Sequence, residues 1–512
     1  MIRLILHEGK SYSAEEIRTQ VIQNHTAHGF VADFPEEQSM RVAKRIIEAL
    51  TELKLPSTQL PTASVVPVSE DAENEDALDD ERDEDNRVYL ARPTRNGGLA
   101  LRHLVGSATL QWQQSDDLPP VAIEVLPKIR HRNEKDDRAG LRRMWEYACD
   151  LNLREEEKAN KADDARMPLH EWLIQRFLEQ VDQLLARGIR AQYVEHEDNL
   201  LTVRGRLSIQ ENLRQNAHAP HRFFCRFEEF SPNRPENRLI KSAILAVRAH
   251  TQVPATRRRA AHLAEWLHEV PVSADISRDF ALWQTGRLMT QYLEIRPTCE
   301  WILRSLSATP VAGRQPMFGR FVRMNDVFER YVVRWSGETL ASSSRFRIYD
   351  QVSAPDNIKT LYEEPTVGKK DMQPDMRIYD GKECVAILDA KWKAPSDGQT
   401  PSDGDLYQMF AYAYHWLALP HKTEEMKLIG LVYPTADESR YSAHFSFPAL
   451  KSIKSIAGGR LRFLLPKWDD ATGKWREGFL VTRDEGFPFF SSDAAQDLIC
   501  RQRGEASINQ SA

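Results

Sequence analysis

The sequence predicts a multi-domain α/β protein with a β-rich N-terminal module, a helical middle region and a C-terminal α/β core. The chain has 512 residues, of which 41% are hydrophobic, and a single core rarely grows beyond about 250 to 300 residues. Short apolar runs near the N-terminus give way to helical spacing in the middle, and a mixture of both follows residue 315. We therefore expect domains at residues 1–165, 166–310 and 311–485, followed by a tail at 486–512.

The N-terminal module combines short strands with one helix. We expect strands at residues 3–7, 88–91, 98–112 and 121–126, and a helix at 38–53 that prolines close. The segment at about 69–87 is rich in Asp and Glu. Such a run repels itself and buries nothing, so we expect a disordered insertion. A DNA-mimicking acidic arm is the functional alternative.

The middle region shows apolar residues at helical spacing from Leu169 to Leu185, and the pattern stops at Gly188. Further helices are expected at residues 236–250, 256–269 and 297–306. No repeat of 20 to 50 residues is evident.

The C-terminal core begins with a helix and continues with strands. We expect a helix at residues 325–335, strands at 346–350, 376–379 and 384–391, a helix at 405–419, and a strand at 427–433. Ser402 or Asp403 caps the second helix and Pro420 ends it. The last strand is apolar throughout, which is typical of burial on both faces.

Charge and cysteine usage limit the class of protein. There are 69 basic and 75 acidic residues, a net charge of -6, which argues against a surface covered in positive charge without excluding a DNA enzyme. The five cysteines lie far apart and lack zinc-site spacing. No signal peptide or membrane-spanning run is present, so we expect a cytoplasmic protein without a membrane partner. No phosphate-loop motif occurs, so we expect this chain to bind no nucleotide.

Two acidic strand ends carry the chemistry. Asp375 precedes one strand of a predicted hairpin, and Asp389-Ala390-Lys391 ends the next. Side chains alternate along a strand, so Asp389 and Lys391 share a face. Two carboxylates can hold Mg²⁺ or Mn²⁺, and the ammonium can orient or help deprotonate an attacking water. The pattern favours metal-dependent phosphodiester hydrolysis; a solvated Asp-Lys pair at a surface strand end is the alternative.

Three further residues can complete this site. Glu329 lies beside the apolar stripe of the preceding helix, where it can be a metal ligand or an ordinary rim glutamate. Gln408 and Tyr412 are four apart and share one helix face. They can position the lysine or a DNA phosphate, or simply pack in the core.

Together Asp375, Asp389, Lys391, Gln408 and Tyr412 resemble the PD-(D/E)xK nucleases in the branch with a Q-xxx-Y helix. Segments at residues 123–128, 205–207, 227–230, 237–241 and 324–329, with Asn216, resemble the McrC family of nuclease subunits from modified-cytosine restriction systems. The matches spread from about residue 98 to 435. The resemblance therefore covers most of the chain.

This resemblance implies an N-terminal module that docks on a hexameric, McrB-like AAA+ GTPase and a C-terminal DNA endonuclease. It implies catalytic roles for Asp375, Asp389 and Lys391, with Asp375 and Asp389 as metal ligands and Glu329 beside them. The N-terminal stretch to about residue 85 is longer than the family's usual opening, which puts the docking surface in question.

A basic, aromatic stretch precedes the core. Arginines and lysines alternate with phenylalanines, as suits a DNA backbone path; the candidates are Arg204, Arg206, Arg234, Arg238 and Lys241, with Lys393 beside the acidic strand end. Ion pairs with neighbouring glutamates are the alternative. A stand-alone repair or recombination nuclease and a non-cutting activator of an AAA+ NTPase are the alternative functions.

Overall fold

The computed structural model describes most of the helices and strands of this chain. The described residues are 2–27, 36–52, 54–55, 88–110, 121–131, 133–148, 167–251, 253–286, 289–307, 317–341, 346–350, 359–364, 368–394, 401–417, 427–436, 443–445, 456–469, 474–476 and 479–480. The predicted acidic insertion at 69–87 and the predicted tail at 486–512 lie outside them. The fold forms two compact units, one of Met1–His170 with Thr309–Ala512 and one of Glu171–Ala308.

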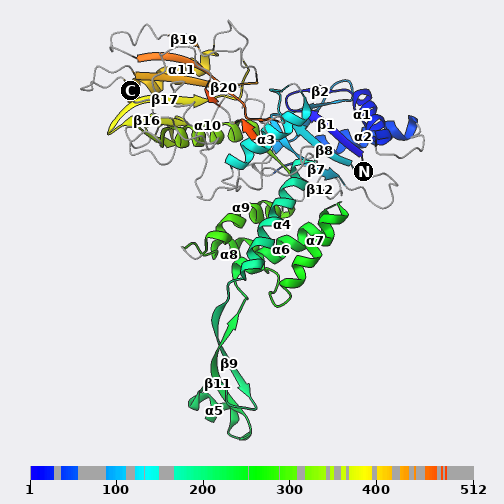
Figure 1. Ribbon diagram of the computed structural model, residues 1–512, viewed down its shortest axis with the longest axis vertical. Coiled ribbons are helices and arrows are strands. Elements are labelled where there is room, and N and C mark those ends of the chain that lie inside the picture. Colours follow the sequence, from blue (N-terminus) through cyan, green and yellow to red (C-terminus); the bar gives the residue numbers. More distant parts are fainter. Residues whose placement is uncertain are drawn as a thin grey trace, which may run out of the picture. The chain divides into compact units, whose positions relative to one another are not determined.

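A four-stranded sheet organises the N-terminal module, and Figure 1 labels its strands β1, β7, β8 and β12. Its order is β1-β8-β7-β12, with β1 parallel to β8 and the other pairs antiparallel. The strands are β1 (Ile2–His7), β8 (Val121–Leu126), β7 (Leu104–Leu110) and β12 (Met317–Arg323). The strands expected at residues 3–7 and 121–126 are confirmed, and the one expected at 98–112 is two strands.

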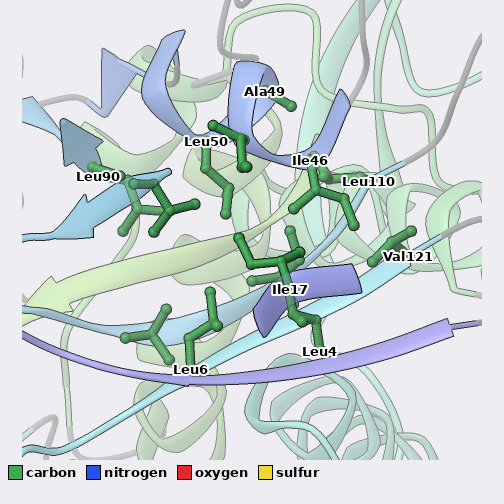
Figure 2. Close-up of a cluster of buried hydrophobic side chains, with 14 of the residues drawn as sticks. Leu4, Leu6, Ile17, Ile46, Ala49, Leu50, Leu90, Leu110 and Val121 are labelled. Atoms are coloured by element: carbon green, nitrogen blue, oxygen red, sulfur yellow. The ribbon is translucent and has the colours of Figure 1, made fainter. Parts of the chain in front are cut away.

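Two helices bury one face of this sheet. They are α1 (Ala14–Ala27), which the sequence did not predict, and α2 (Glu36–Glu52), which confirms the helix expected at 38–53. Figure 2 shows Leu4 of β1, Ile17 of α1 and Leu50 of α2 converging in the core between them. Apolar burial of this extent stabilises the module by about 25 cal/mol per Å² removed from water.

Smaller elements complete the module. They are β2 (Ser11–Tyr12), β5 (Ala91–Pro93) and β6 (Leu99–Leu101) in one sheet, the pair β3 (Lys54–Leu55) and β4 (Val88–Tyr89), and the helix α3 (Glu134–Ala148). No helix was predicted for the α3 region.

Strand β12, which comes after the second unit in the sequence, belongs to the sheet of the N-terminal module. It lies in the range assigned to the C-terminal domain, yet it pairs with β7 along its whole length. Gly319 permits the close approach, because a Cβ there would lie 2.3 Å from the Ser107 carbonyl oxygen and from Ala108 Cα. The first and third expected domains are consequently parts of one compact unit.

The second unit combines helices with a β-ribbon. Its helices are α4 (Leu169–Arg187), α6 (Pro235–His250), α7 (Pro254–Trp266), α8 (Ile276–Ala281) and α9 (Thr290–Ser307). The helix from Leu169 and those expected at 236–250 and 256–269 are confirmed. The helix expected at 297–306 begins earlier, at Thr290, with Pro297 inside it.

The ribbon, residues 192–231, corrects the prediction of a wholly helical middle region. It comprises β9 (Gln192–Leu200), β10 (Arg206–Leu207), α5 (Ile209–Asn216) and β11 (Phe223–Ser231), in the sheet order β10-β11-β9. Figure 1 shows it extending from the helices of its unit. Strand β9 has charged residues on both faces and is mostly exposed, so it lacks the alternation that marks a half-buried strand.

The C-terminal core is a seven-stranded mixed sheet of order β13-β16-β17-β18-β20-β19, with β23 pairing β20. Its strands are β13 (Phe346–Asp350), β16 (Met376–Asp380), β17 (Glu383–Ala390), β18 (Lys427–Thr435), β19 (Ala443–Phe445), β20 (Ile456–Leu464) and β23 (Phe479–Leu480). Two hairpins are separate from it: β14 (Lys359–Glu364) with β15 (Gly368–Met372), and β21 (Lys467–Asp469) with β22 (Lys474–Arg476).

Helices flank this sheet in the predicted order. Helix α10 (Met324–Ala341) precedes β13, and α11 (Asp403–Tyr412) continues into a π-helical turn, η6 (Ala413–Leu417), between the parallel strands β17 and β18. Met409, Tyr412 and Trp416 of α11 and η6 share a buried cluster with Ile387 of β17. The opposite face of the sheet packs on α10. There the ring centroids of Phe463 from β20 and Trp335 from α10 lie 5.0 Å apart.

Two sequence expectations concern the chain as a whole. None of the helices within the described ranges has the length and apolar character that a bilayer crossing needs. Cys225, Cys299 and Cys384 are buried free thiols.

Candidate active site at the end of strand β17

The β16–β17 hairpin places two carboxylates side by side. Met376 pairs with Leu388, so Asp375, one residue earlier, comes beside Asp389, one residue later. The Ala390 backbone N–H donates to Asp375 Oδ2 at 2.7 Å. Gly381 turns the hairpin with a φ of 61°, a conformation that glycine adopts readily. The predicted pairing of the two acidic strand ends is therefore present.

Lys391 connects the strand end to α11. Its Nζ lies 2.7 Å from Asp389 Oδ2 and donates to Gln408 Oε1 at 3.0 Å. Gln408 Nε2 in turn donates to the Tyr412 hydroxyl at 2.9 Å. The structure thus brings Asp389, Lys391, Gln408 and Tyr412 into one chain of contacts, with Asp375 attached through Ala390.

The start of α11 fixes this arrangement. Ser402 caps the helix, because its Oγ accepts from the Asp405 backbone N–H at 3.2 Å. Such a cap satisfies one of the amides that a helix leaves without an internal partner. Of the two caps that the sequence allowed, the structure has Ser402.

Burial strengthens the interactions between the charged groups of the site, because little water screens them. Asp389 is 1% exposed and Lys391 is 6% exposed. Burial opposes the charged form of Lys391, yet the nearby carboxylates of Asp389 and Asp375 prevail and raise its pKa above the usual range. Burial and the same two carboxylates raise the pKa of the Tyr412 hydroxyl. The buried strand end therefore contains an ammonium held by acidic groups.

Glu329 on α10 lies within electrostatic reach of these acids. Burial raises its pKa well above the ordinary value of 4.5, and the charges of Asp375, Asp326 and Asp389 raise it further. Mutual repulsion among carboxylates is relieved when a cation joins them. The expected position of Glu329 beside the strand ends agrees with this electrostatic coupling.

The donor set can be compared with what a divalent cation needs. In the described ranges no three or more His, Cys, Asp or Glu side chains are arranged as a ready-made metal site. Mg²⁺ is usually bound by one or two carboxylates together with water and substrate phosphates. Asp389 Oδ2 is buried and lies 2.7 Å from the Lys391 ammonium. Asp375 and Asp389 thus fit the chemistry of a Mg²⁺ or Mn²⁺ site with two protein ligands.

Sequence reasoning missed two residues here. Asp405 is 4% exposed and its Oδ2 lies 3.3 Å from Lys393 Nζ, and its charge also raises the pKa of Lys391. Tyr433 of β18 is buried, and burial together with Asp405 raises the pKa of its hydroxyl. The signal for Asp405 was available, because it precedes Gln408 by three residues and so shares its helix face.

The candidate DNA path is largely occupied by intramolecular contacts. Arg234 lies 3.2 Å from Glu236, and Arg238 lies 2.6 Å from Asp279. Lys241 Nζ donates to the backbone carbonyls of His268 and Val270. These three side chains stabilise the second unit, in line with the alternative interpretation of the stretch.

The other three candidates for DNA contact are Arg204, Arg206 and Lys393. Arg204 is exposed and stacks on Phe227, with its guanidinium 4.3 Å from the ring centroid. Arg206 is exposed on β10. Both belong to the ribbon, and Lys393 forms the ion pair with Asp405. Among the candidates of the second unit, Arg204 and Arg206 of the ribbon are therefore the exposed ones.

The chain is similar to known proteins in both sequence and fold. The family model described as McrBC 5-methylcytosine restriction system component matches residues 99–434. No match to a curated protein was found. A refined half-complex from a tetradecameric assembly of Thermococcus gammatolerans McrB AAA+ hexamers with bound McrC contains a similar chain. The two are 18% identical with a TM-score of 0.58, over 90% of this chain and 94% of that one.

A second solved structure is more distant. A chain in the cryo-EM structure of the Thermococcus gammatolerans McrBC complex is 18% identical, with a TM-score of 0.43 over 66% of this chain and 88% of that one. The first likeness shows a common fold over most of both chains.

Proposed function

This chain belongs to the McrBC 5-methylcytosine restriction system family, and from that premise we propose that it is the DNA-cutting component of such a system. Its reaction is the Mg²⁺-dependent hydrolysis of DNA phosphodiester bonds, driven by an AAA+ NTPase on a separate chain. The single observation that carries the proposal is the buried contact of Lys391 with Asp389, at a strand end that also holds Asp375.

The proposed site corresponds to the PD-(D/E)xK nuclease core. Asp375 and Asp389 would hold the cation. When bound, Mg²⁺ polarises the scissile phosphate and makes a water molecule more acidic. The chain itself excludes bulk water from this strand end, because Asp389 and Lys391 are almost wholly buried.

Lys391 is proposed to orient the attacking water and to offset negative charge on the phosphate. Its neighbours favour the ammonium over the neutral amine, so it serves as a donor. Gln408 Oε1 and Asp389 Oδ2 set the direction of Nζ. Preorganised donors of this kind stabilise charge that develops in a transition state.

The ribbon is the surface that we propose for the AAA+ partner. It exposes large apolar side chains, including Tyr193 at 70% and Phe230 at 63%; the others are Leu201, Val203, Ile209 and Leu213. Tyr193 and Phe230 pair across β9 and β11 with ring centroids 5.1 Å apart. A pair of large apolar side chains left exposed in this way marks a candidate interaction site. This argument favours the ribbon over the N-terminal module that the resemblance suggested.

The test is reconstitution with the natural partner. The full chain is purified from its native host with whatever AAA+ protein accompanies it. Plasmid DNA with and without 5-methylcytosine is then incubated with Mg²⁺ and either GTP or ATP. We expect cutting of methylated DNA that requires both chains, the nucleotide and Mg²⁺. Efficient cutting of unmodified DNA by this chain alone would replace the proposal with a stand-alone nuclease.

A further inference from the structure

Glu8 is a buried carboxylate of the N-terminal module that contacts the C-terminal core. It follows β1 and is 1% exposed, and its backbone N–H donates to the Leu126 carbonyl at 3.0 Å. Its Oε1 accepts from the Lys128 backbone N–H at 3.0 Å and also from the indole Nε1 of Trp392. One carboxylate oxygen thus joins the end of β8 to the segment that follows the candidate site.

Trp392 occupies a position next to the chemistry. It follows Lys391, whose backbone N–H donates to the Val432 carbonyl at 2.9 Å. Its ring is 1% exposed and lies 5.3 Å from the Phe328 ring, between centroids. Phe328 immediately precedes Glu329 on α10. The indole is thus carried by the residue next to Lys391 and packs against the residue next to Glu329.

The two faces of the strand end have different partners. Asp389 and Lys391 face α11, since Lys391 bonds Gln408. Trp392 faces α10 and Glu8. A shift of the indole would move the backbone that carries Lys391, because the two residues are adjacent.

We propose that Glu8 is a positioning residue for the nuclease site, which holds Lys391 in place through its hydrogen bond to Trp392. The inference rests on the proposed function for its consequence in DNA cutting. It makes the N-terminal module part of the catalytic architecture. A carboxyl oxygen is suited to this, because the N–H of a buried indole needs a hydrogen-bond acceptor.

The experiment compares Glu8→Ala, Glu8→Gln, Trp392→Phe and the double variant Glu8→Ala/Trp392→Phe in the full chain with its AAA+ partner. Cutting of methylated plasmid is measured in Mg²⁺ at varied DNA concentration. We expect Glu8→Ala and Trp392→Phe each to lower kcat about tenfold, with KM for DNA nearly unchanged. The double variant should be no slower than the slower single one. Glu8→Gln keeps the Oε1 acceptor and should restore most of the rate.

A matched control separates positioning from general loss of stability. Tyr12→Phe removes a neighbouring buried hydrogen bond, in which the Tyr12 hydroxyl accepts from the His7 backbone N–H at 2.9 Å. We expect it to lower the melting temperature without slowing cutting. An equal loss of kcat in Tyr12→Phe, or no rescue by Glu8→Gln, would overturn the proposal.

Amide hydrogen exchange gives a readout that needs no DNA cutting. In Glu8→Ala, and not in Tyr12→Phe, the peptide at residues 389–393 should exchange about tenfold faster, because the Lys391 amide reports on the strand end. Unchanged exchange in Glu8→Ala would overturn the inference. If the wild-type complex cuts no DNA, the proposed function fails, and this measurement still decides whether Glu8 positions Lys391.

Discussion

Lys391 Nζ lies 2.7 Å from Asp389 Oδ2 at a buried strand end. The contact links the Lys391 ammonium, which we propose acts on the DNA phosphate, to Asp389, one of the two proposed metal ligands. Its removal should therefore affect cutting and stability together.

Replacing Lys391 with methionine should lower DNA cutting at least about 100-fold, the effect typical of losing one preorganised charge-stabilising donor. It should also lower stability by about 3 to 5 kcal/mol, because Asp389 and Asp375 lose their buried counter-charge. Cutting assays and urea unfolding measure the two effects. Lys382→Met, at the exposed turn of the same hairpin, is the control and should leave both unchanged. Wild-type cutting in Lys391→Met would rule out the proposed role.

Replacing Gln408 with methionine should slow cutting about tenfold, since Lys391 loses an acceptor of a charged hydrogen bond. Tyr412→Phe should have a smaller effect, because its hydroxyl contacts Gln408 and not Lys391. Tyr407→Ala, on the same helix and 76% exposed, is the control. Equal rates for Gln408→Met and Tyr407→Ala would show that the helix supplies packing alone.

The stability of the metal-free chain should depend on pH through Glu329. Burial, followed by Asp375, Asp326 and Asp389, raises the pKa of Glu329 well above 4.5. A carboxyl group with a raised folded-state pKa contributes stability below its unfolded-state pKa, and that stability is lost as pH rises through the folded-state pKa. The melting temperature should therefore fall as pH rises above about 4.5, and Glu329→Gln should fall less.

Thermal melts across this pH range check the prediction, with Glu338→Gln as the control. Glu338 is an exposed glutamate of the same helix. Parallel curves for the wild type and Glu329→Gln would contradict the electrostatic coupling. Addition of Mg²⁺ at high pH should stabilise the wild type more than Glu329→Gln, because a cation relieves carboxylate repulsion.

Polar substitutions on the ribbon should break the complex without unfolding the chain. Tyr193→Ser/Phe230→Ser removes a mutually packed, exposed pair, so association with the AAA+ partner should weaken by at least about tenfold. The melting temperature should change little. Trp266→Ser, which alters a 63% exposed aromatic on α7 of the same unit, should bind normally. Size-exclusion chromatography and calorimetry measure binding, and undiminished binding by the ribbon variant would move the interface elsewhere.

Local patterns predicted the centre of the candidate site well. Strand β17 is apolar up to Asp389, and Lys391 follows its end, so one segment of the sequence shows both the strand and its charged end. Gln408 and Tyr412 follow from helical spacing alone. The fold places these residues together as expected, while their catalytic roles stay predictions.

Local patterns could not predict contacts between segments that are far apart in the sequence. Strand β12 looks like the start of the C-terminal domain, and its pairing with β7 depends on a partner far away in the sequence. Glu8 is an ordinary residue at the end of a strand until the fold brings Trp392 to it. Both long strands of the ribbon are mostly exposed and β9 has charged residues on both faces, so hydrophobic periodicity could not reveal the ribbon.

The most direct test of the central claim is single-turnover cutting of methylated plasmid by the complex that contains Asp389→Asn. This variant keeps the size of the side chain and loses the negative charge that a hard cation requires. We predict no detectable DNA cutting, normal stimulation of the partner's NTP hydrolysis and a chain that still folds but melts at a lower temperature, because Lys391 loses a buried counter-charge. Cutting at the wild-type rate by Asp389→Asn would contradict the assignment of the nuclease site to the end of β17.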